Sequence, residues 1–439
     1  MAATRFRTGG QIRLVASLAV WLGCALVLAN CNPGPVAGVA TPTPLSVPVP
    51  QPDAGVTPTR QFDLTPEPAP FTDSIGMPFP VPSTAANPIL TVNRQTAWGR
   101  DLSIRQMPAS VDDQHIFMLS GVAEDGRFVV GTIVPRDRRS MEKPRIALMD
   151  TATGRLTEIA TAHNYASNAY FACAGATVDG DWVVWQEGRK FRVYNVVTQA
   201  LSEVQPAARV GSDSIGPYAL PSTGGVWVDN GILVWAERSN EPAPPDKMPS
   251  VVKTYDLATG SMQTVGRYGA QPVISWPIVA WIEPDLTTEV DGELQADLVA
   301  LNLQTGERRT LIRFWSMREI GIHGDAIVGR SGSMVFLINL DGTRKQVIAP
   351  ENMGWEGRFT MNERLVTACH GPDRVWDRAQ DRLVSLNGYG YTLSKIINGH
   401  MLAWQSVGSY KEWIYSTQSG NVLPGDLAIH LLDTSQLPK

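Results

Sequence analysis

A seven-residue pattern, a polar turn followed by an apolar run, recurs seven times along this chain. The clearest copy is Asp179-Gly180-Asp181-Trp182-Val183-Val184-Trp185. The seven copies cover residues 125–131, 179–185, 229–235, 275–281, 323–329, 362–368 and 398–404. Asx-Gly pairs favour the turns that join antiparallel strands. Each copy therefore predicts a hairpin turn that leads into a buried strand.

A second signal follows each copy: an apolar strand, a polar turn with glycine, and a further short strand. The clear cases run from Ile146 to Gly154, Val251 to Gly260, Leu298 to Gly306 and Val335 to Gly342. Weaker versions occupy residues 193–204, 375–386 and 413–420. Together the two signals predict four antiparallel strands in each repeating unit.

A four-stranded unit of this length cannot bury both of its faces alone, whereas units stacked around an axis can. No unit shows the 3.6-residue apolar period of a helical repeat. We therefore expect an all-β fold, a seven-bladed β-propeller of four-stranded antiparallel blades. The first and sixth units are the least regular, so six or eight blades remain open. A terminal strand at residues 89–92 or 427–432 is expected to close the ring.

The order of Val-Val-Trp, a strand ending in Asp or Asn, and Thr-Gly resembles the repeats of TolB-like (WD40-like) bacterial β-propellers. The resemblance extends from about residue 115 to residue 423. It implies a propeller in a bacterial cell envelope and says little about activity. The small α/β domain that precedes the propeller in TolB itself has no counterpart here, so a role in the Tol system is not implied.

The N-terminus has the layout of an export signal. Three arginines (Arg5, Arg7 and Arg13) precede an apolar stretch from Leu14 to Ala29. Leu28-Ala29-Asn30-Cys31 resembles the lipobox of bacterial lipoproteins, although Asn30 stands where a small residue is usual. We expect residues 1–31 to be a signal peptide with lipid attachment at Cys31. An uncleaved anchor and cleavage after Ala40 remain alternatives.

Residues 32–88 differ sharply in composition from the rest of the chain. Fifteen of the 32 prolines lie here, among Thr, Ser, Ala and Val. Proline prevents helix and sheet from propagating and favours extended segments. We expect a disordered, semi-rigid spacer between the anchor and a propeller at residues 89–439. The propeller would then be extracytoplasmic, tethered to the outer face of the cell membrane.

Charge and cysteine content exclude some classes of protein. The net charge is −5 and no basic stripe is present, so nucleic acid is not an expected partner. The chain has four cysteines: Cys24 and Cys31 near the N-terminus, and Cys173 and Cys369 far apart in the folded region. We interpret the last two as separate buried thiols.

No residue pattern commits the chain to a reaction, a metal or a cofactor. Four tryptophans recur at one position of the repeat and are expected to pack between blades: Trp185, Trp235, Trp281 and Trp404. Four acidic turn residues are more consistent with hairpin turns than with calcium binding: Asp125, Asp179, Asp181 and Asp229. The histidines are scattered at positions 115, 163, 323, 370, 400 and 430, with no paired spacing.

Three insertions follow the Val-Val-Trp strand, at about residues 132–143, 237–250 and 284–296. The first is basic, the second is proline-rich with mixed charge, and the third is acidic. Propeller geometry should place them on one rim, and variable loops on a rigid scaffold are common binding sites. We therefore expect a monomeric binding or scaffold propeller that recognises an envelope or extracellular protein, peptide or glycan. An envelope glycan or peptide hydrolase or lyase is one alternative. A structural envelope component without a discrete site is another.

Overall fold

In the computed structural model, 28 strands and one short 3₁₀ helix, Thr434–Gln436, are defined among the described residues. The structure describes Trp98 and residues 102–137, 140, 142–161, 176–187, 190–206, 226–290, 293–332, 334–343, 345–349, 355–372, 374–386, 391–406 and 427–438. The expected signal peptide, Cys31 and the spacer at 32–88 lie outside this part of the chain.

The strands group into seven blades of four in chain order. The first blade contains β2 (His115–Val122), β3 (Phe128–Pro135), β4 (Arg145–Asp150) and β5 (Leu156–Thr161). The second contains β6 (Ala176–Asp179), β7 (Trp182–Glu187), β8 (Lys190–Asn195) and β9 (Leu201–Val204). The third contains β10 (Trp227–Asp229), β11 (Ile232–Arg238), β12 (Ser250–Asp256) and β13 (Met262–Arg267). The fourth contains β14 (Ala270–Ser275), β15 (Ile278–Val290), β16 (Glu293–Asn302) and β17 (Arg308–Trp315).

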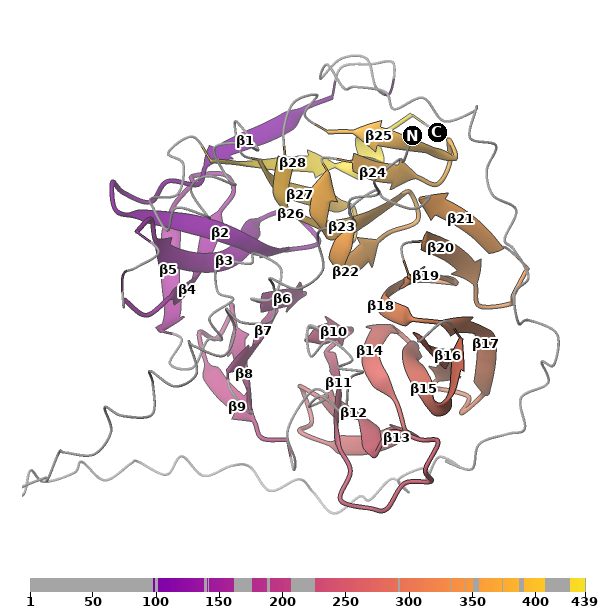
Figure 1. Cartoon of the computed structure of the whole chain (residues 1–439). Coiled ribbons are helices and arrows are strands. Elements are labelled where there is room, and N and C mark those ends of the chain that lie inside the picture. The colour runs from indigo at the N-terminus through magenta and orange to yellow at the C-terminus, as the bar shows by residue number, and fades with distance from the viewer. Residues whose placement is uncertain are drawn as a thin grey trace, which may run out of the picture. The chain divides into compact units, whose positions relative to one another are not determined.

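The fifth blade contains β18 (Met317–His323), β19 (Ala326–Ser331), β20 (Met334–Asn339) and β21 (Lys345–Ala349). The sixth contains β22 (Glu356–Met361), β23 (Leu365–Pro372), β24 (Arg374–Asp377) and β25 (Arg382–Ser385). The seventh contains β26 (Tyr391–Asn398), β27 (Met401–Ser406), β28 (Ala428–Asp433) and β1 (Ile104–Pro108). The seven-bladed all-β prediction is confirmed, and Figure 1 shows the blades arranged as a ring.

The hairpin turns form where the Asx-Gly pattern predicts them. In the third blade, Asn230 and Gly231 both have positive φ, 50° and 71°. They form a two-residue turn between Asp229 and Ile232, which are paired across β10 and β11. Positive φ at both central residues matches the twist of the flanking strands, and it explains why Asn and Gly stand here.

The ring is closed by a strand that we did not predict from the sequence. β1 pairs antiparallel with β28, so one N-terminal strand completes a blade whose other three strands come from the C-terminus. The candidate at 427–432 corresponds to β28, the third strand of that blade, and the candidate at 89–92 lies outside the described residues. The closing segment Ile-Arg-Gln-Met-Pro has no apolar alternation, because as an outermost strand it buries little more than Met107.

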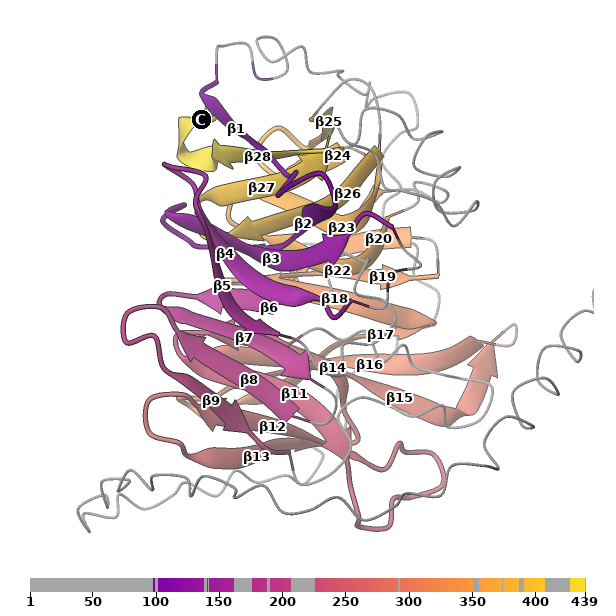
Figure 2. The same ribbon diagram turned by 90° about the vertical axis from the view of Figure 1, so that its left-hand side faces the viewer.

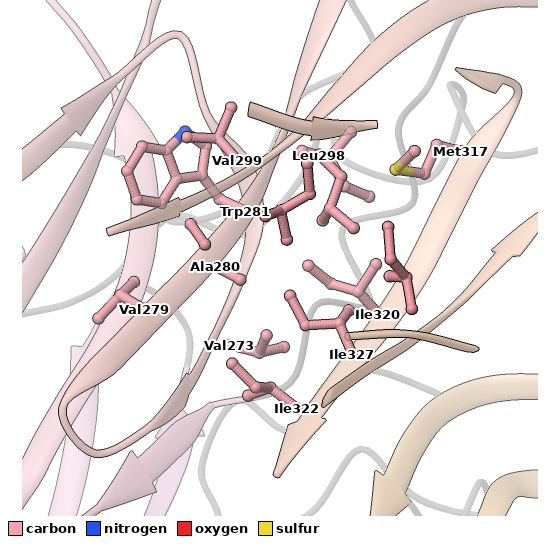
Figure 3. Close-up of a cluster of buried hydrophobic side chains, with 14 of the residues drawn as sticks. Val273, Val279, Ala280, Trp281, Leu298, Val299, Met317, Ile320, Ile322 and Ile327 are labelled. Carbon is pink, nitrogen blue, oxygen red and sulfur yellow. The ribbon is translucent and has the colours of Figure 1, made fainter. Parts of the chain in front are cut away.

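The recurring tryptophans pack between blades, as predicted. Trp185, Trp235, Trp281 and Trp404 are at most 3 % exposed. In Figure 3, Trp281 belongs to a cluster that also contains Ile320 and Ile322 of the next blade. On the side of the preceding blade, a Cβ at Gly269 would lie 2.5 Å from Trp281 Cδ1. The ring of Trp281 therefore occupies space that a glycine leaves open.

The two faces of the disc differ in which connections they carry. Strands alternate in direction, so the turn face carries the hairpins between first and second strands, and the insertion face carries the connections between second and third strands. Figure 2 shows β15 and β16 extending beyond their blade on the insertion face. All three predicted insertions are second-to-third connections, so the topology places them on this face.

Candidate functional site

The first strands of all seven blades line a central cavity. Residues of β2, β6, β10, β14, β18, β22 and β26 contribute to its wall. Its free space for water-sized molecules is about 80 Å³, which is room for roughly five to eight waters. A site of this size fits a small ion or molecule and excludes a folded partner.

Arg358 of the sixth blade reaches across this cavity. Its Nη2 donates to Thr177 Oγ1 of the second blade at 3.1 Å. Its guanidinium carbon lies 3.8 Å from the ring centre of Trp227 in the third blade, within the range of a cation–π contact. The second and third blades each lie three positions from the sixth blade, in opposite directions around the ring. The side chain of Arg358 therefore extends across the central axis.

A guanidinium in this position is poorly solvated. Burial lowers the pKa of Arg358 to about 9, so the side chain is still protonated at neutral pH. Among the described residues no carboxylate forms an ion pair with it, and its buried Nε has no hydrogen-bond acceptor. Lys395, fully buried on β26, also lines the cavity and donates to the Gly371 carbonyl at 3.4 Å. Two basic side chains, those of Arg358 and Lys395, therefore lie in the wall of the cavity.

The acidic turn residues lie at the turn face, where they join neighbouring blades. Asp179 Oδ2 accepts the Gly231 N–H at 2.6 Å, and Asp229 Oδ2 accepts the Trp276 N–H at 2.5 Å. Asp181 pairs with Arg127, which also contacts Asp125. The structure thus assigns these carboxylates to connections between or within turns, which agrees with the hairpin interpretation.

Every pair of neighbouring blades has a polar contact of this kind on the turn face. In ring order the seven contacts are Arg127–Asp181, Asp179–Gly231, Asp229–Trp276, Ser275–Gly324, His323–Glu363, Asn362–Gly399 and Asn398–Val122. The contacts use different chemistry: an ion pair between Arg127 and Asp181, a contact between His323 and Glu363, and a backbone donor or acceptor in the others. Because no consensus motif links these residues, this ring of contacts was not predicted from the sequence.

Two of these carboxylates have raised pKa values. Burial raises the pKa of Asp179 despite the Gly231 N–H. Burial, followed by the nearby charge of Asp179, raises the pKa of Asp229 despite the Trp276 N–H. Asp229 lines the cavity, and Asp179 is close enough to influence its pKa. Carboxylates with raised pKa values near a cavity are what the hydrolase alternative requires.

We expect Asp229→Asn to separate the structural role of this carboxyl from an effect of its charge. The amide oxygen can still accept the Trp276 N–H, while the buried charge is removed. In the wild type the pKa of Asp229 in the folded protein lies above its ordinary value of 3.8. Between these two pKa values the native state therefore binds more protons than the unfolded state does. The stability that the protonated carboxyl gives the native state is lost as pH rises through the folded pKa. The variant should therefore match or exceed the wild type at neutral pH, and the difference should shrink at about pH 4.5.

Urea denaturation at the two pH values measures this effect. Asp229→Ala is the matched variant, because it leaves the Trp276 N–H without an acceptor and should cost about 1–3 kcal/mol. Equal losses in the Asn and Ala variants at neutral pH would contradict a hydrogen-bonding role for this carboxyl.

Two of the three insertions are joined to each other. Lys247 and Asp285 form an antiparallel bridge, and the Leu286 N–H donates to the Asp246 carbonyl at 2.8 Å. We call residues 239–249 and 284–296 the joint rim. Glu241 on the joint rim also pairs with Arg267 of β13 at 3.1 Å. These contacts hold a long connection and a long hairpin as one unit on neighbouring blades.

The acidic character expected of the third insertion is partly structural. Glu283 is buried and accepts from Trp281 Nε1 and Arg308 Nη2, each at 2.8 Å. Burial alone would raise the pKa of Asp285, but hydrogen bonds from Thr287 and Thr288 hold it below its usual value. The side chains of Glu289, Asp291 and Glu293 lie outside the described residues.

The first insertion is anchored to its own blade. Arg136 donates to Ser110 Oγ at 2.6 Å. His115 contacts Glu142 and Asp112, each at 2.9 Å, and the hydrogen bond with Glu142 contributes most to the raised pKa of His115. Arg138 and Arg139, part of its basic character, lie outside the described residues.

Cys369 corrects the interpretation of the cysteines. It is 1 % exposed, lines the cavity, and is disulfide-bonded rather than a free thiol. The other three cysteines, including Cys173, lie outside the described residues. A wide sequence separation gives no sign of pairing, since only the fold brings distant blades together.

The remaining histidines form no metal site within the described ranges. Glu363 lies between His323 and His400, at 3.5 Å and 3.2 Å, and His430 stacks on Trp404. No group of three His, Cys, Asp or Glu residues in the described part of the chain could hold a metal ion. No described helix is long and apolar enough to cross a membrane. His163 lies outside the described residues.

Comparisons with known proteins add likenesses of fold. No family model matches the chain, and no curated protein matches it in sequence. The β-propeller domain of the trilobed protease from Pyrococcus furiosus is 8 % identical, with a TM-score of 0.46 over 68 % of this chain and 91 % of that chain. An acylaminoacyl peptidase from Pyrococcus horikoshii is 11 % identical, with a TM-score of 0.42 over 66 % of this chain and 49 % of that chain.

An oligogalacturonate lyase from Vibrio parahaemolyticus is 10 % identical, with a TM-score of 0.33 over 76 % of this chain and 96 % of that chain. These similar structures include two peptidases and a lyase, whose activities differ. At such identities and scores they carry no argument about the activity of this chain. The described strands themselves establish a seven-bladed β-propeller.

Proposed function

We propose that this protein is a tethered, extracytoplasmic binding propeller that recognises a protein or peptide through the joint rim. The observation that carries the proposal is the backbone bridge between Lys247 and Asp285. It converts two insertions on neighbouring blades into one surface. A surface held rigidly before binding loses less conformational entropy when a partner docks.

The chemistry of the joint rim supports a macromolecular partner. Glu241, Pro242, Pro244 and Pro245 are exposed on its first segment, and Thr287 on its second. Proline limits backbone freedom, so this exposed edge loses less conformational entropy on binding than a loop without proline would. Small molecules prefer concave, apolar sites, whereas a protruding edge of prolines and charges suits contact with another chain. A glycan partner is an outcome that the experiment below distinguishes.

Two observations support a location outside the cytoplasm. The N-terminal pattern that ends at Cys31 is typical of export and lipid attachment. Cys369 is disulfide-bonded, and disulfides persist mainly in oxidising compartments. The proline-rich residues 32–88 would then act as a spacer between membrane and propeller. Intact-mass analysis of the mature protein tests the tether, since lipidated Cys31 should be the first residue.

A variant with both rim segments shortened tests the binding role. Residues 240–248 are replaced by Asn-Gly between Ser239 and Pro249, and residues 286–294 by Asn-Gly between Asp285 and Gln295. Both junctions join backbone segments that lie opposite each other, Ser239 by a hydrogen bond to Pro249 and Asp285 by its pairing with Gln295. Two-residue Asn-Gly turns suit such junctions.

The full-length protein is crosslinked in intact cells of its source, and captured molecules are identified by mass spectrometry. We expect one protein to be captured by the wild type and lost in the shortened variant. The matched control carries Ala258→Ser and Gln304→Ser in outer turns on the turn face, and it should capture as the wild type does. Equal capture by the shortened variant would reject the proposal, and capture of glycan alone would replace its partner class.

A catalytic role for Asp179 and Asp229 is the second candidate, favoured by their raised pKa values. It predicts turnover of an envelope glycan or peptide that Asp229→Asn abolishes while the fold is retained. Undiminished turnover in that variant would exclude Asp229 from catalysis. The blade contacts of both carboxylates explain their burial without catalysis, which is why binding is preferred.

A further inference from the structure

The strongest unexplained feature of the molecule is the cation in the central cavity. Arg358 contacts a hydroxyl and an aromatic ring, and neither carries a negative charge. Arg358 is partly buried, with its Nε fully buried. A charge withdrawn from water without a counterion is costly, and such charges in proteins are usually paired or bound to ions. The joint rim does not involve this cavity, so the feature is independent of the proposed function.

We infer that the central cavity is a binding site for a small oxyanion, a phosphate or a carboxylate, held by the guanidinium of Arg358. Oxyanions of this kind form strong, charge-assisted hydrogen bonds with arginine. The free space of about 80 Å³ accommodates an ion of this size.

Other cavity residues support this assignment. Lys395 adds a second positive side chain to the wall, and Ser120 and Thr177 add hydroxyl groups. Trp227 lies against the guanidinium and fixes its position. The site thus combines positive charge, hydroxyl groups and a rigid aromatic support on the first strands of five blades.

The charge distribution also places the anion within the cavity. Asp229 lines the cavity at the end where the first strands meet the turn face. Arg358 lies three residues before the end of β22, and Lys395 three residues before the end of β26. An anion is repelled from the Asp229 end and attracted toward the two basic side chains.

A purely structural role for Arg358 makes different predictions. If the side chain only braced blades two, three and six, its removal would destabilise the protein, and added anions would act equally on wild type and variant. If it is an anion site, removing the charge should leave stability in chloride unchanged or higher, because an uncompensated buried cation is lost. Arg358→Met suits this comparison, because methionine retains an apolar side chain that can pack on Trp227.

The test uses the full-length protein in detergent. ³¹P NMR of inorganic phosphate and ¹³C NMR of labelled acetate report binding by line broadening, and chloride at equal ionic strength controls for screening. We expect broadening by at least one of the two ions with the wild type and at least a tenfold weaker affinity with Arg358→Met. Arg155→Met, at an exposed position in the turn before β5, is the matched control and should bind as the wild type does.

Comparing phosphate with acetate identifies the class of oxyanion that the cavity binds, because the ion with the higher affinity shows whether the site selects phosphates or carboxylates. Arg358→Lys keeps the charge and should retain part of the binding, which guards against a folding defect in Arg358→Met. Equal binding by wild type and Arg358→Met would overturn the inference. Failure of the wild type to bind either phosphate or acetate would overturn the inference as well.

Discussion

Trp281→Ala is expected to lower the free energy of unfolding by about 3–5 kcal/mol. Trp281 is fully buried between the third, fourth and fifth blades, and its Nε1 donates to buried Glu283. Gly266 and Gly269 leave the space that its ring fills, and a Cβ at Gly266 would lie 2.9 Å from Trp281 Cζ2. The substitution would leave a cavity with backbone on one side and a packed neighbouring blade on the other. This arrangement limits how far the cavity can collapse.

Urea denaturation followed by far-UV circular dichroism measures this loss. Trp276→Ala is the matched control, because it removes the same side chain from a position that is 37 % exposed. It should cost clearly less stability than Trp281→Ala does, because less of its side chain is buried. A loss from Trp281→Ala no larger than the loss from the control would contradict its role between blades.

Removal of residues 1–108 is expected to cost on the order of 5 kcal/mol or more, because it deletes the closing strand. β1 has five paired positions with β28, from Ile104 to Pro108. The deletion also removes buried Trp98, whose Nε1 donates to Asp377 Oδ2 at 2.8 Å. The exposed edge of β28 would then be open to pairing with other chains.

Removal of residues 1–96 is the matched truncation, since it keeps Trp98 and β1. It should unfold at the temperature of the full-length propeller and remain monomeric in light scattering. The longer deletion should unfold at a lower temperature and aggregate. If both truncations behave alike, closure by β1 contributes little to stability, and the propeller tolerates an open ring.

The repeat predicts the fold well because each blade repeats the same local chemistry. The Asx-Gly turn before Ile232 and the Val-Val-Trp strand are local features, and the strands form where these features lie. The packing of Trp281 follows from its repeated position. The closing strand is different, because β1 depends on a partner more than 300 residues away in the chain. Its own residues carry no strand pattern.

The cavity could not be predicted from the sequence for a related reason. Arg358 stands in a segment with no motif, and its partners Thr177 and Trp227 belong to other blades. Only closure of the ring brings these three residues together at the axis. The same holds for Cys369, whose bonded state depends on the fold.

The insertions could be predicted from the sequence only in part. Their placement after the second strand of a blade is readable from the sequence, and the topology confirms one common face. The bridge between Lys247 and Asp285 is not readable, since it joins two loops of unrelated composition. This bridge is also what distinguishes the joint rim from the first insertion, whose anchoring contacts are with its own blade.

The two faces of the disc therefore have different roles in this account. The turn face holds the ring together through at least one polar contact between each pair of neighbouring blades. Under the proposed function, the insertion face presents the joint rim to a partner. Under the further inference, the central cavity holds a small oxyanion independently of the joint rim.

Hydrogen–deuterium exchange of the full-length protein, with and without its captured partner, tests the binding role of the joint rim most directly. We predict slower exchange in residues 239–249 and 284–296 in the complex, with unchanged exchange in the hairpins of the turn face. Protection confined to the turn face, or no protection in either rim segment, would contradict recognition through the joint rim.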